Sequence, residues 1–137
     1  MKEKLIRAAE NNQIAEVERL LADFEFAKIR ALRASARKGY LKVSLRLIKA
    51  GVDVNAPNEA GCTPLMFAVC GGHLDVLKAL IQQGADVLKK NNMGKDAYHF
   101  AMFKGDKVIA KEIINTVKKK MMFCLVSQNQ LVTLERE

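Results

Sequence analysis

The sequence predicts an all-α solenoid of about four helix-turn-helix units joined by short β-hairpin-like loops. First, the turn glycines Gly39, Gly72 and Gly105 lie 33 residues apart, twice over. Second, apolar positions repeat at the same interval. Third, aromatic residues are only 6% of the chain and Trp is absent, so small and medium aliphatic side chains dominate, as in closely packed helices. Because a two-helix unit cannot bury its apolar face alone, we expect neighbouring units to stack.

The 33-residue shift aligns whole columns of residues and not only the turn glycines. It pairs apolar positions, a second set of glycines and one acidic position: Ala68 with Ala101, Val76 with Ile109, Leu80 with Ile113, Leu47 with Leu80, Gly51 with Gly84, and Asp53 with Asp86. An acid that recurs at the repeat interval indicates loop architecture rather than a unique active site.

The third unit shows how local signals define each helix. Thr63 is a good N-cap, and the residue after it is a proline, which is tolerated at the first helical position. We therefore expect a first helix over Pro64–Gly71 and a second over His73–Gln82. Gly84 then supplies a left-handed residue that ends the second helix.

These segments carry a family resemblance. The runs Gly61-Cys62-Thr63-Pro64-Leu65-Met66-Phe67-Ala68, Gly72-His73-Leu74-Asp75-Val76-Leu77 and Gly84-Ala85-Asp86-Val87 resemble the ankyrin repeat. The second unit adds Gly51-Val52-Asp53-Val54-Asn55-Ala56, and the fourth adds Gly94-Lys95-Asp96-Ala97-Tyr98-His99-Phe100-Ala101, with Asp96 as the N-cap. The resemblance covers about residues 2–117. It implies a protein-interaction module and not an enzyme, with His99 tying neighbouring repeats together through hydrogen bonds and Asn55 stabilising its hairpin.

The units run over about 2–24, 25–57, 58–90 and 91–120, and the first and last depart from the pattern. The turn at Asn11-Asn12 lies only 27 residues before Gly39, so the first hairpin is expected to be absent. Asp23-Phe24-Glu25-Phe26 would then lead directly into a helix over Ala27–Lys38. Leu88 stands where the family usually has Asn. Polar residues also interrupt apolar columns at Glu16, Ser44 and Arg46.

Residues 121–137 form a C-terminal capping segment or tail. Either the last helix continues through Lys118-Lys119-Lys120, or the apolar run Met121–Val126 folds back over the open end of the stack. We favour a cap, because the open end of a solenoid exposes an apolar face. The alternative is a segment that binds a partner or touches a membrane.

Composition narrows the class of protein. No apolar run approaches the ~18 residues that a transmembrane helix needs, and the polar start of the chain does not resemble a signal peptide. The three cysteines lack framework spacing, which favours reduced thiols in the cytoplasm. Neither zinc-ligand spacing nor a nucleophile motif is present in the sequence. We therefore expect a monomer without metal or cofactor.

Positive charge is concentrated in one stretch. From Phe26 to Val52 there are eight Lys and Arg and no acid, which equals the net charge of +8 of the whole chain. The run is either a solvated face or a binding surface on the inner side of the solenoid. The expected contact residues are Arg30, Arg33, Arg37, Lys38, Cys70, Phe103 and Lys104 on the inner face, and Glu59, Cys62, Asn92, Met93 and Lys95 at the hairpin tips.

An acidic protein surface is the expected partner, because arginine adds bidentate carboxylate contacts to bare charge. The alternative is a polyanion, either nucleic acid or anionic lipid head groups, bound through the second unit. Nucleic acid is less favoured, since no aromatic residue for base stacking interleaves with the basic residues in the sequence.

Overall fold

The computed structural model of the chain describes residues 2–20 and 25–136, with side chains described for 3–19 and 27–126. Within these ranges there are eight helices and no strand, as the sequence predicts for an all-α repeat protein. The helices are α1 (Lys2–Glu10), α2 (Ile14–Leu20), α3 (Glu25–Lys38), α4 (Leu41–Lys49), α5 (Pro64–Gly71), α6 (Leu74–Gln82), α7 (Ala97–Lys104) and α8 (Lys107–Arg136).

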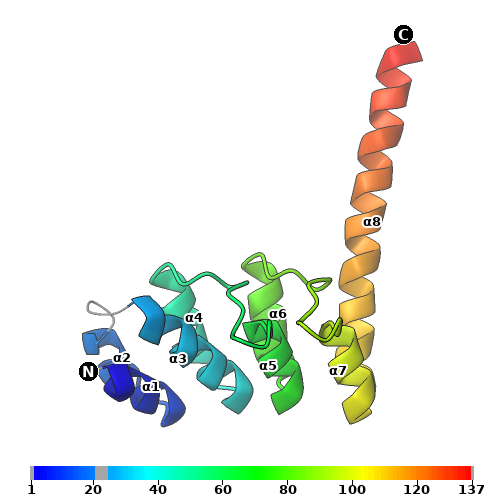
Figure 1. Cartoon of the computed structure of the whole chain (residues 1–137). Helices are drawn as coiled ribbons and strands as arrows, with labels where there is room; N and C mark the ends of the chain where they lie inside the picture. Colours follow the sequence, from blue (N-terminus) through cyan, green and yellow to red (C-terminus); the bar gives the residue numbers. More distant parts are fainter. Residues whose placement is uncertain (1, 21–24, 137) are drawn as a thin grey trace.

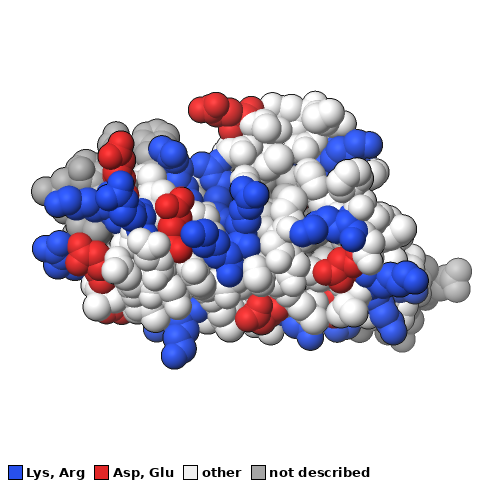
Figure 2. Space-filling model, turned by 90° about the horizontal axis from the view of Figure 1, so that it is seen from below, with Lys and Arg blue, Asp and Glu red and all other residues white. Residues whose placement is uncertain are grey.

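The helices form a row of antiparallel pairs (Figure 1). The first helices of the units, α1, α3, α5 and α7, pack against one another in order, while α2, α4 and α6 form a second row. The loops after α4 and α6 lie on one side of the stack. The tight turns within the units lie on the opposite side, which Figure 2 shows from below.

The tight turns need residues that tolerate a left-handed backbone. Gly39, Gly72 and Gly105 have φ angles of 77°, 75° and 72°. In the first unit Asn12 takes this position with φ 58°, which asparagine accepts more readily than most residues with a side chain. The repeat predicted from the glycines therefore extends to a unit that has none.

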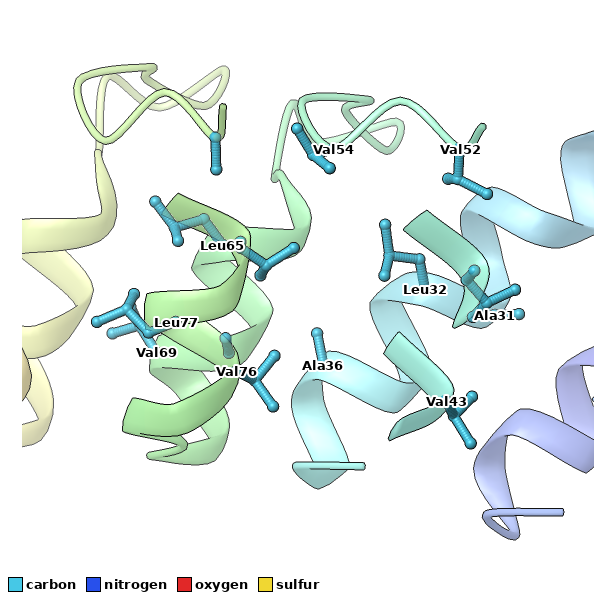
Figure 3. Close-up of a cluster of buried hydrophobic side chains, with 14 of the residues drawn as sticks. Ala31, Leu32, Ala36, Val43, Val52, Val54, Leu65, Val69, Val76 and Leu77 are labelled. Atoms are coloured by element: carbon cyan, nitrogen blue, oxygen red, sulfur yellow. The ribbon is translucent and has the colours of Figure 1, made fainter. Parts of the chain in front are cut away.

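The core is built on small side chains where the first helices meet. Ala8, Ser35, Ala68 and Ala101 occupy equivalent positions in the four units and are fully buried. Their size allows the helix axes to approach closely. Larger apolar side chains from both helix rows and from the loop after α4 fill the space around them (Figure 3): Leu32, Val43, Val52, Val54, Leu65, Val69, Val76 and Leu77.

Two serines replace apolar residues inside the second unit, and the structure explains both together. The Ser35 and Ser44 hydroxyl oxygens lie 2.9 Å apart, and Ser35 Oγ also donates to the Leu32 carbonyl at 3.0 Å. Both side chains are fully buried. The Ser44 interruption seen in the sequence is thus satisfied by a second serine on the facing helix.

The connection between the first two units is short. Helix α2 ends at Leu20 and α3 begins at Glu25, two residues before the predicted start. The predicted route through Asp23 and Phe24 lies outside the described residues. Helix α3 has 14 residues, whereas α5 and α7 have eight each.

Asn55 joins the second and third units through its side chain. Its amide nitrogen donates to the Gly84 carbonyl at 3.1 Å, and its oxygen accepts from the Asp86 N–H at 2.8 Å. Leu88, the equivalent residue one unit later, has no such groups and is 56% exposed. The predicted hairpin role of Asn55 therefore agrees with its contacts, and the leucine at position 88 cannot form the equivalent side-chain hydrogen bonds.

Thr63 holds the N-cap position of α5 as predicted, whereas the expected role of His99 needs correction. Thr63 has the extended backbone of an N-cap, but its buried hydroxyl has no hydrogen-bond partner among the described residues. Among the described residues His99 bonds only within its own unit: its Nδ1 lies 2.7 Å from Asp96 Oδ1. Asp96 Oδ1 also accepts from the His99 N–H at 3.0 Å, which makes Asp96 the better cap. Met66 holds the equivalent place in the third unit and offers only a thioether sulfur.

The C-terminal cap that the sequence favoured is not formed. Helix α8 continues for 30 residues through the three lysines and projects beyond the stack (Figure 1), which is the other alternative. The run from Lys107 to Arg136 contains neither Gly nor Pro, so nothing in it ends the helix. Side chains from Met121 to Val126 are exposed instead of covering the last unit.

The serine pair leads to a stability prediction. Ser35→Ala should lower the free energy of unfolding by about 1–3 kcal/mol, because it leaves the Ser44 hydroxyl buried without its partner. Adding Ser44→Ala should recover part of this loss. Urea unfolding of the wild type, both single variants and the double variant measures the effect. Additive losses in the double variant would contradict the pairing.

Candidate functional site

Four basic residues predicted from the sequence line one groove on the inner side of the stack. Their side chains surround a hollow of about 540 Å³ between α1, α3 and the start of the third unit. The basic residues are Arg30, Arg33, Arg37 and Lys38, and the other lining residues are Ile6, Glu10, Ala34 and Phe67. We call this hollow the basic groove. It combines positive charge with an apolar floor.

The repeat register explains why arginines stand there. Counting 33 residues back from the caps of the third unit, Arg30 occupies the position of Thr63 and Arg33 that of Met66. In the later units these positions begin a helix. In the second unit they lie inside α3, because α3 starts five residues before Arg30. Because neither residue caps a helix, both side chains can point into the groove.

The arginines of the basic groove are close to one another and form no ion pair with the part of the chain that the structure describes. Among the described residues, the guanidinium groups of Arg30, Arg33 and Arg37 form no hydrogen bond or ion pair. Burial, and after it the charge of Arg30, lowers the pKa of Arg33, while Glu59 at the next hairpin tip acts in the opposite direction. A group that is both partly desolvated and repelled by a like charge gains most from an incoming carboxylate.

The ammonium groups of the two inner-face lysines already form hydrogen bonds within the protein. Lys38 Nζ donates to the Glu10 carbonyl at 3.1 Å, and Lys104 Nζ donates to the Cys70 carbonyl. In each case the lysine reaches the C-terminal end of the first helix in the preceding unit, where the carbonyl dipoles favour a cation. The arginines are therefore the more available charges of the inner face.

The same face becomes aromatic two units later. Lys95, His99, Phe100 and Phe103 surround a second hollow, which we call the aromatic end. By the repeat register, Phe103 stands at the position of Arg37, and its side chain is 92% exposed. The inner face thus runs from arginine in the second unit to phenylalanine in the fourth.

Cys70 lies between these two ends and is half-buried. Burial raises the pKa of its thiol, although the charge of nearby Lys104 opposes the shift. The thiol therefore stays protonated near neutral pH, as is typical of a structural cysteine. Over the described residues, no group of three or more metal-ligating side chains could hold a metal ion, and none of the helices is long and apolar enough to cross a membrane.

The hairpin tips are held together by asparagine side chains. Asn58 Oδ1 accepts from the backbone of Cys62 at 2.9 Å, and Asn91 Oδ1 accepts from Lys95 at 3.0 Å. Asn92 Nδ2 donates to the Glu59 carbonyl at 2.9 Å and so links the two tips. Of the predicted tip residues, Asn92 therefore has one side-chain donor engaged in a hydrogen bond within the protein. Glu59, Lys95 and Met93 point outward, the last 81% exposed, and Cys62 is half-buried.

The remaining basic residues of the second unit lie on the outer helix. Arg46 forms an ion pair with Glu18 at 3.1 Å, and Lys42 and Lys49 on the same helix are exposed. Seen from below, Lys and Arg form several groups across the molecule, with fewer Asp and Glu among them (Figure 2). The basic residues of the second unit are therefore divided between the inner helix α3 and the outer helix α4.

Sequence reasoning missed the apolar half of the basic groove. Phe67 belongs to the third unit but lines the groove beside the arginines of the second. The sequence indicates no aromatic stacking platform among the basic residues, whereas the structure places Phe67 in the lining of their groove. The repeat register contained the signal, since Phe67 occupies the position of Ala34 one unit on, and both line this hollow.

The junction beside the groove leads to a prediction about Gly71. This residue stands at the position of Lys38 and Lys104, and a Cβ on it would lie 2.0 Å from the Arg37 carbonyl oxygen. Helix propensity alone would make Gly71→Ala stabilising by about 1 kcal/mol. We expect the clash to reverse the sign and to cost about 1–3 kcal/mol in thermal or urea unfolding. Lys104→Ala is the control, and a Gly71→Ala protein as stable as the wild type would contradict the close approach.

Comparison with known proteins agrees with the architecture. The family model described as "Ankyrin repeats (3 copies)" matches residues 5–91 and 31–123, which together cover most of the chain. No curated protein matches the sequence. With its 33-residue period, paired helices and inter-unit hairpin contacts, the chain belongs to the ankyrin-repeat family.

Proposed function

We propose that the chain is an adaptor or inhibitor that binds an acidic segment of another protein across its inner face and hairpin tips. Ankyrin repeats are in general protein–protein interaction modules, and proteins of this family are typically non-enzymatic. The partner chemistry proposed here comes from the residues of this chain. The proposed compartment is the cytoplasm.

The observation that carries the proposal is the set of three unpaired arginines in the basic groove. Arg30, Arg33 and Arg37 share one helix and one hollow, and among the described residues no carboxylate forms an ion pair with them, although Glu10 lines the same hollow and Glu59 acts on Arg33 through its charge. Guanidinium groups bind carboxylates through two parallel hydrogen bonds, which adds geometric selectivity to charge. Aspartate or glutamate side chains are thus the natural occupants.

The aromatic end adds a second requirement. Helices that pack in a row lie about 8–10 Å apart, so Phe103 on α7 is about 20 Å from the arginines on α3. An extended chain covers this span with about six residues. We therefore expect a partner segment with acidic residues at one end and an apolar side chain about six residues away. Phe103 would then bury surface that is now in contact with water.

A charge reversal tests the groove. Arg30→Glu together with Arg37→Glu should weaken partner capture by about tenfold or more, because it replaces attraction with repulsion at two central positions. Affinity capture from a lysate followed by mass spectrometry identifies the partners, and titration of the recovered partner gives the dissociation constant. Circular dichroism should show unchanged helix content, since both side chains are exposed.

The outer helix offers a matched control. Lys42→Glu with Lys49→Glu makes the same charge change at the same seven-residue spacing on α4, also at exposed positions. We expect its capture to remain within about twofold of the wild type, since screened charges outside the interface contribute little. Equal losses in both double variants would show that net charge, and not the groove, controls binding.

Polyanion binding is the second candidate, and one observation favours it. Phe67 stands among the arginines of the basic groove, as a stacking residue does in proteins that bind single-stranded nucleic acid. In that case the affinity for a single-stranded oligonucleotide should fall steeply with salt, with a log–log slope of about −0.7 for each phosphate contacted. Fluorescence anisotropy with labelled oligonucleotide between low and moderate salt measures the slope.

The same measurement covers lipid head groups when anionic vesicles replace the oligonucleotide. We expect neither polyanion to compete with the captured protein at physiological ionic strength, since general charge attraction is screened there. Competition by oligonucleotide or vesicles at that ionic strength would favour the second candidate over the first.

A further inference from the structure

The projecting part of α8 and the last hairpin loop form a corner that neither the basic groove nor the aromatic end includes. An apolar hollow of about 280 Å³ lies where they meet. It is lined by Val87 and Leu88 from the loop, Asp96 and Tyr98 at the start of α7, and Ile113, Ile114, Val117 and Lys118 from α8. The Asp96 carboxylate is engaged by His99, whose Nδ1 lies 2.7 Å from Asp96 Oδ1. We call this place the α8 corner. Leu88 is 56% and Ile114 is 37% exposed, so apolar surface remains open to solvent there.

The residue at position 88 differs from its equivalent for a structural reason. Asn55 uses its amide to bind the next hairpin, through Gly84 and Asp86. Thirty-three residues beyond Gly84 and Asp86 stand Val117 and Lys119, which lie inside α8, so the next unit has no hairpin for a side chain at position 88 to bind. An amide there would serve no junction, and the chain instead carries a leucine whose side chain adds to the apolar hollow.

An apolar stripe on α8 continues from the corner past the end of the stack. Ile114, Val117, Met121 and Leu125 are spaced by three, four and four residues, which places them on one face of a helix. Met121 is 62% and Leu125 is 56% exposed. A stripe with this spacing is the surface against which a second helix packs, at a separation of about 8–10 Å.

Charge selects among the possible occupants. Residues 113–126 include Lys118, Lys119 and Lys120 and no acid. A second copy of the chain would bring the same lysines into contact, so self-association through α8 is disfavoured. A lipid bilayer is flat and cannot follow the stripe into the α8 corner, where the loop bearing Leu88 stands beside the helix. A rod-like partner with acidic edges satisfies both conditions.

We infer that the α8 corner binds an amphipathic helix of a partner protein. The apolar stripe of that helix packs on Leu88, Ile114 and Val117, and its acidic edge lies beside Lys118. This surface is separate from the basic groove, so either can be disproved without the other.

The probe for a test is a fluorescein-labelled peptide of three heptads with Leu at a and d and Glu at e and g. Its self-association is opposed by its own charge, and helix formation on binding is visible in circular dichroism. We expect saturable binding to the full chain by fluorescence anisotropy. Leu88→Asn, which restores the residue found at position 55, should weaken binding about tenfold through loss of apolar contact.

Two charge variants form a matched pair. Lys118→Glu should weaken binding severalfold, whereas Lys119→Glu, the same change at a residue outside the hollow, should have a smaller effect. The same peptide with Lys at e and g should not bind. Binding that survives Leu88→Asn and Lys118→Glu in a chain that also carries Arg30→Glu and Arg37→Glu would overturn the assignment, as would equal binding of the basic peptide.

Vesicles containing phosphatidylserine test the alternative that the α8 corner binds a membrane and not a helix. Cosedimentation that is lost in Leu88→Asn and Lys118→Glu, without binding of the acidic peptide, would assign the corner to a membrane and contradict the inference. Arg30→Glu with Arg37→Glu should leave peptide binding at the corner intact, which separates this surface from the basic groove.

Discussion

The close stacking of four first helices holds the molecule together, and it depends on small side chains at one repeated position. Ala8, Ser35, Ala68 and Ala101 are fully buried there, and a larger residue would force the units apart. The same spacing lets Gly71 approach the Arg37 carbonyl and lets Lys38 and Lys104 reach carbonyls of the preceding units. The alignment of the stacked units determines which residues share the inner face. The geometry of the candidate binding surface therefore depends on how the core packs.

The short connection before α3 explains why the inner face of the second unit carries arginines. The connection between the first two units is too short for a regular hairpin, and α3 is correspondingly long. Positions that cap a helix in later units therefore carry Arg30 and Arg33 within a helix in the second. At the far end the stack changes again: α8 continues instead of turning, and Leu88 replaces the junction asparagine. The candidate binding surfaces thus lie beside the two irregular junctions, at the long α3 and at α8, while the third unit is the most regular and contributes Phe67 to the basic groove.

Most of the fold could be predicted from the sequence, because period, caps and turn glycines are local signals. The bounds of α5 matched, and those of α3 and α6 differed by one or two residues at their starts. The serine pair and the partners of His99 could not be predicted, since both depend on how side chains meet across helices. The sequence left two paths open for residues 121–137, a fold back over the stack or a continuation of the last helix. The absence of Gly and Pro from Lys107 to Arg136 favours the continuation that the structure shows. In the groove, sequence indicated the charges but not Phe67, which comes from the neighbouring unit.

We propose that a partner segment lies on the inner face formed by α3, α5 and α7. Chemical-shift perturbation of the ¹⁵N-labelled chain, titrated with its captured partner segment, tests this directly. We expect the largest amide shifts at Arg30 to Lys38, Phe67 and Phe103. Shifts confined to the outer helices α4 and α6, with the inner helices unaffected, would contradict it.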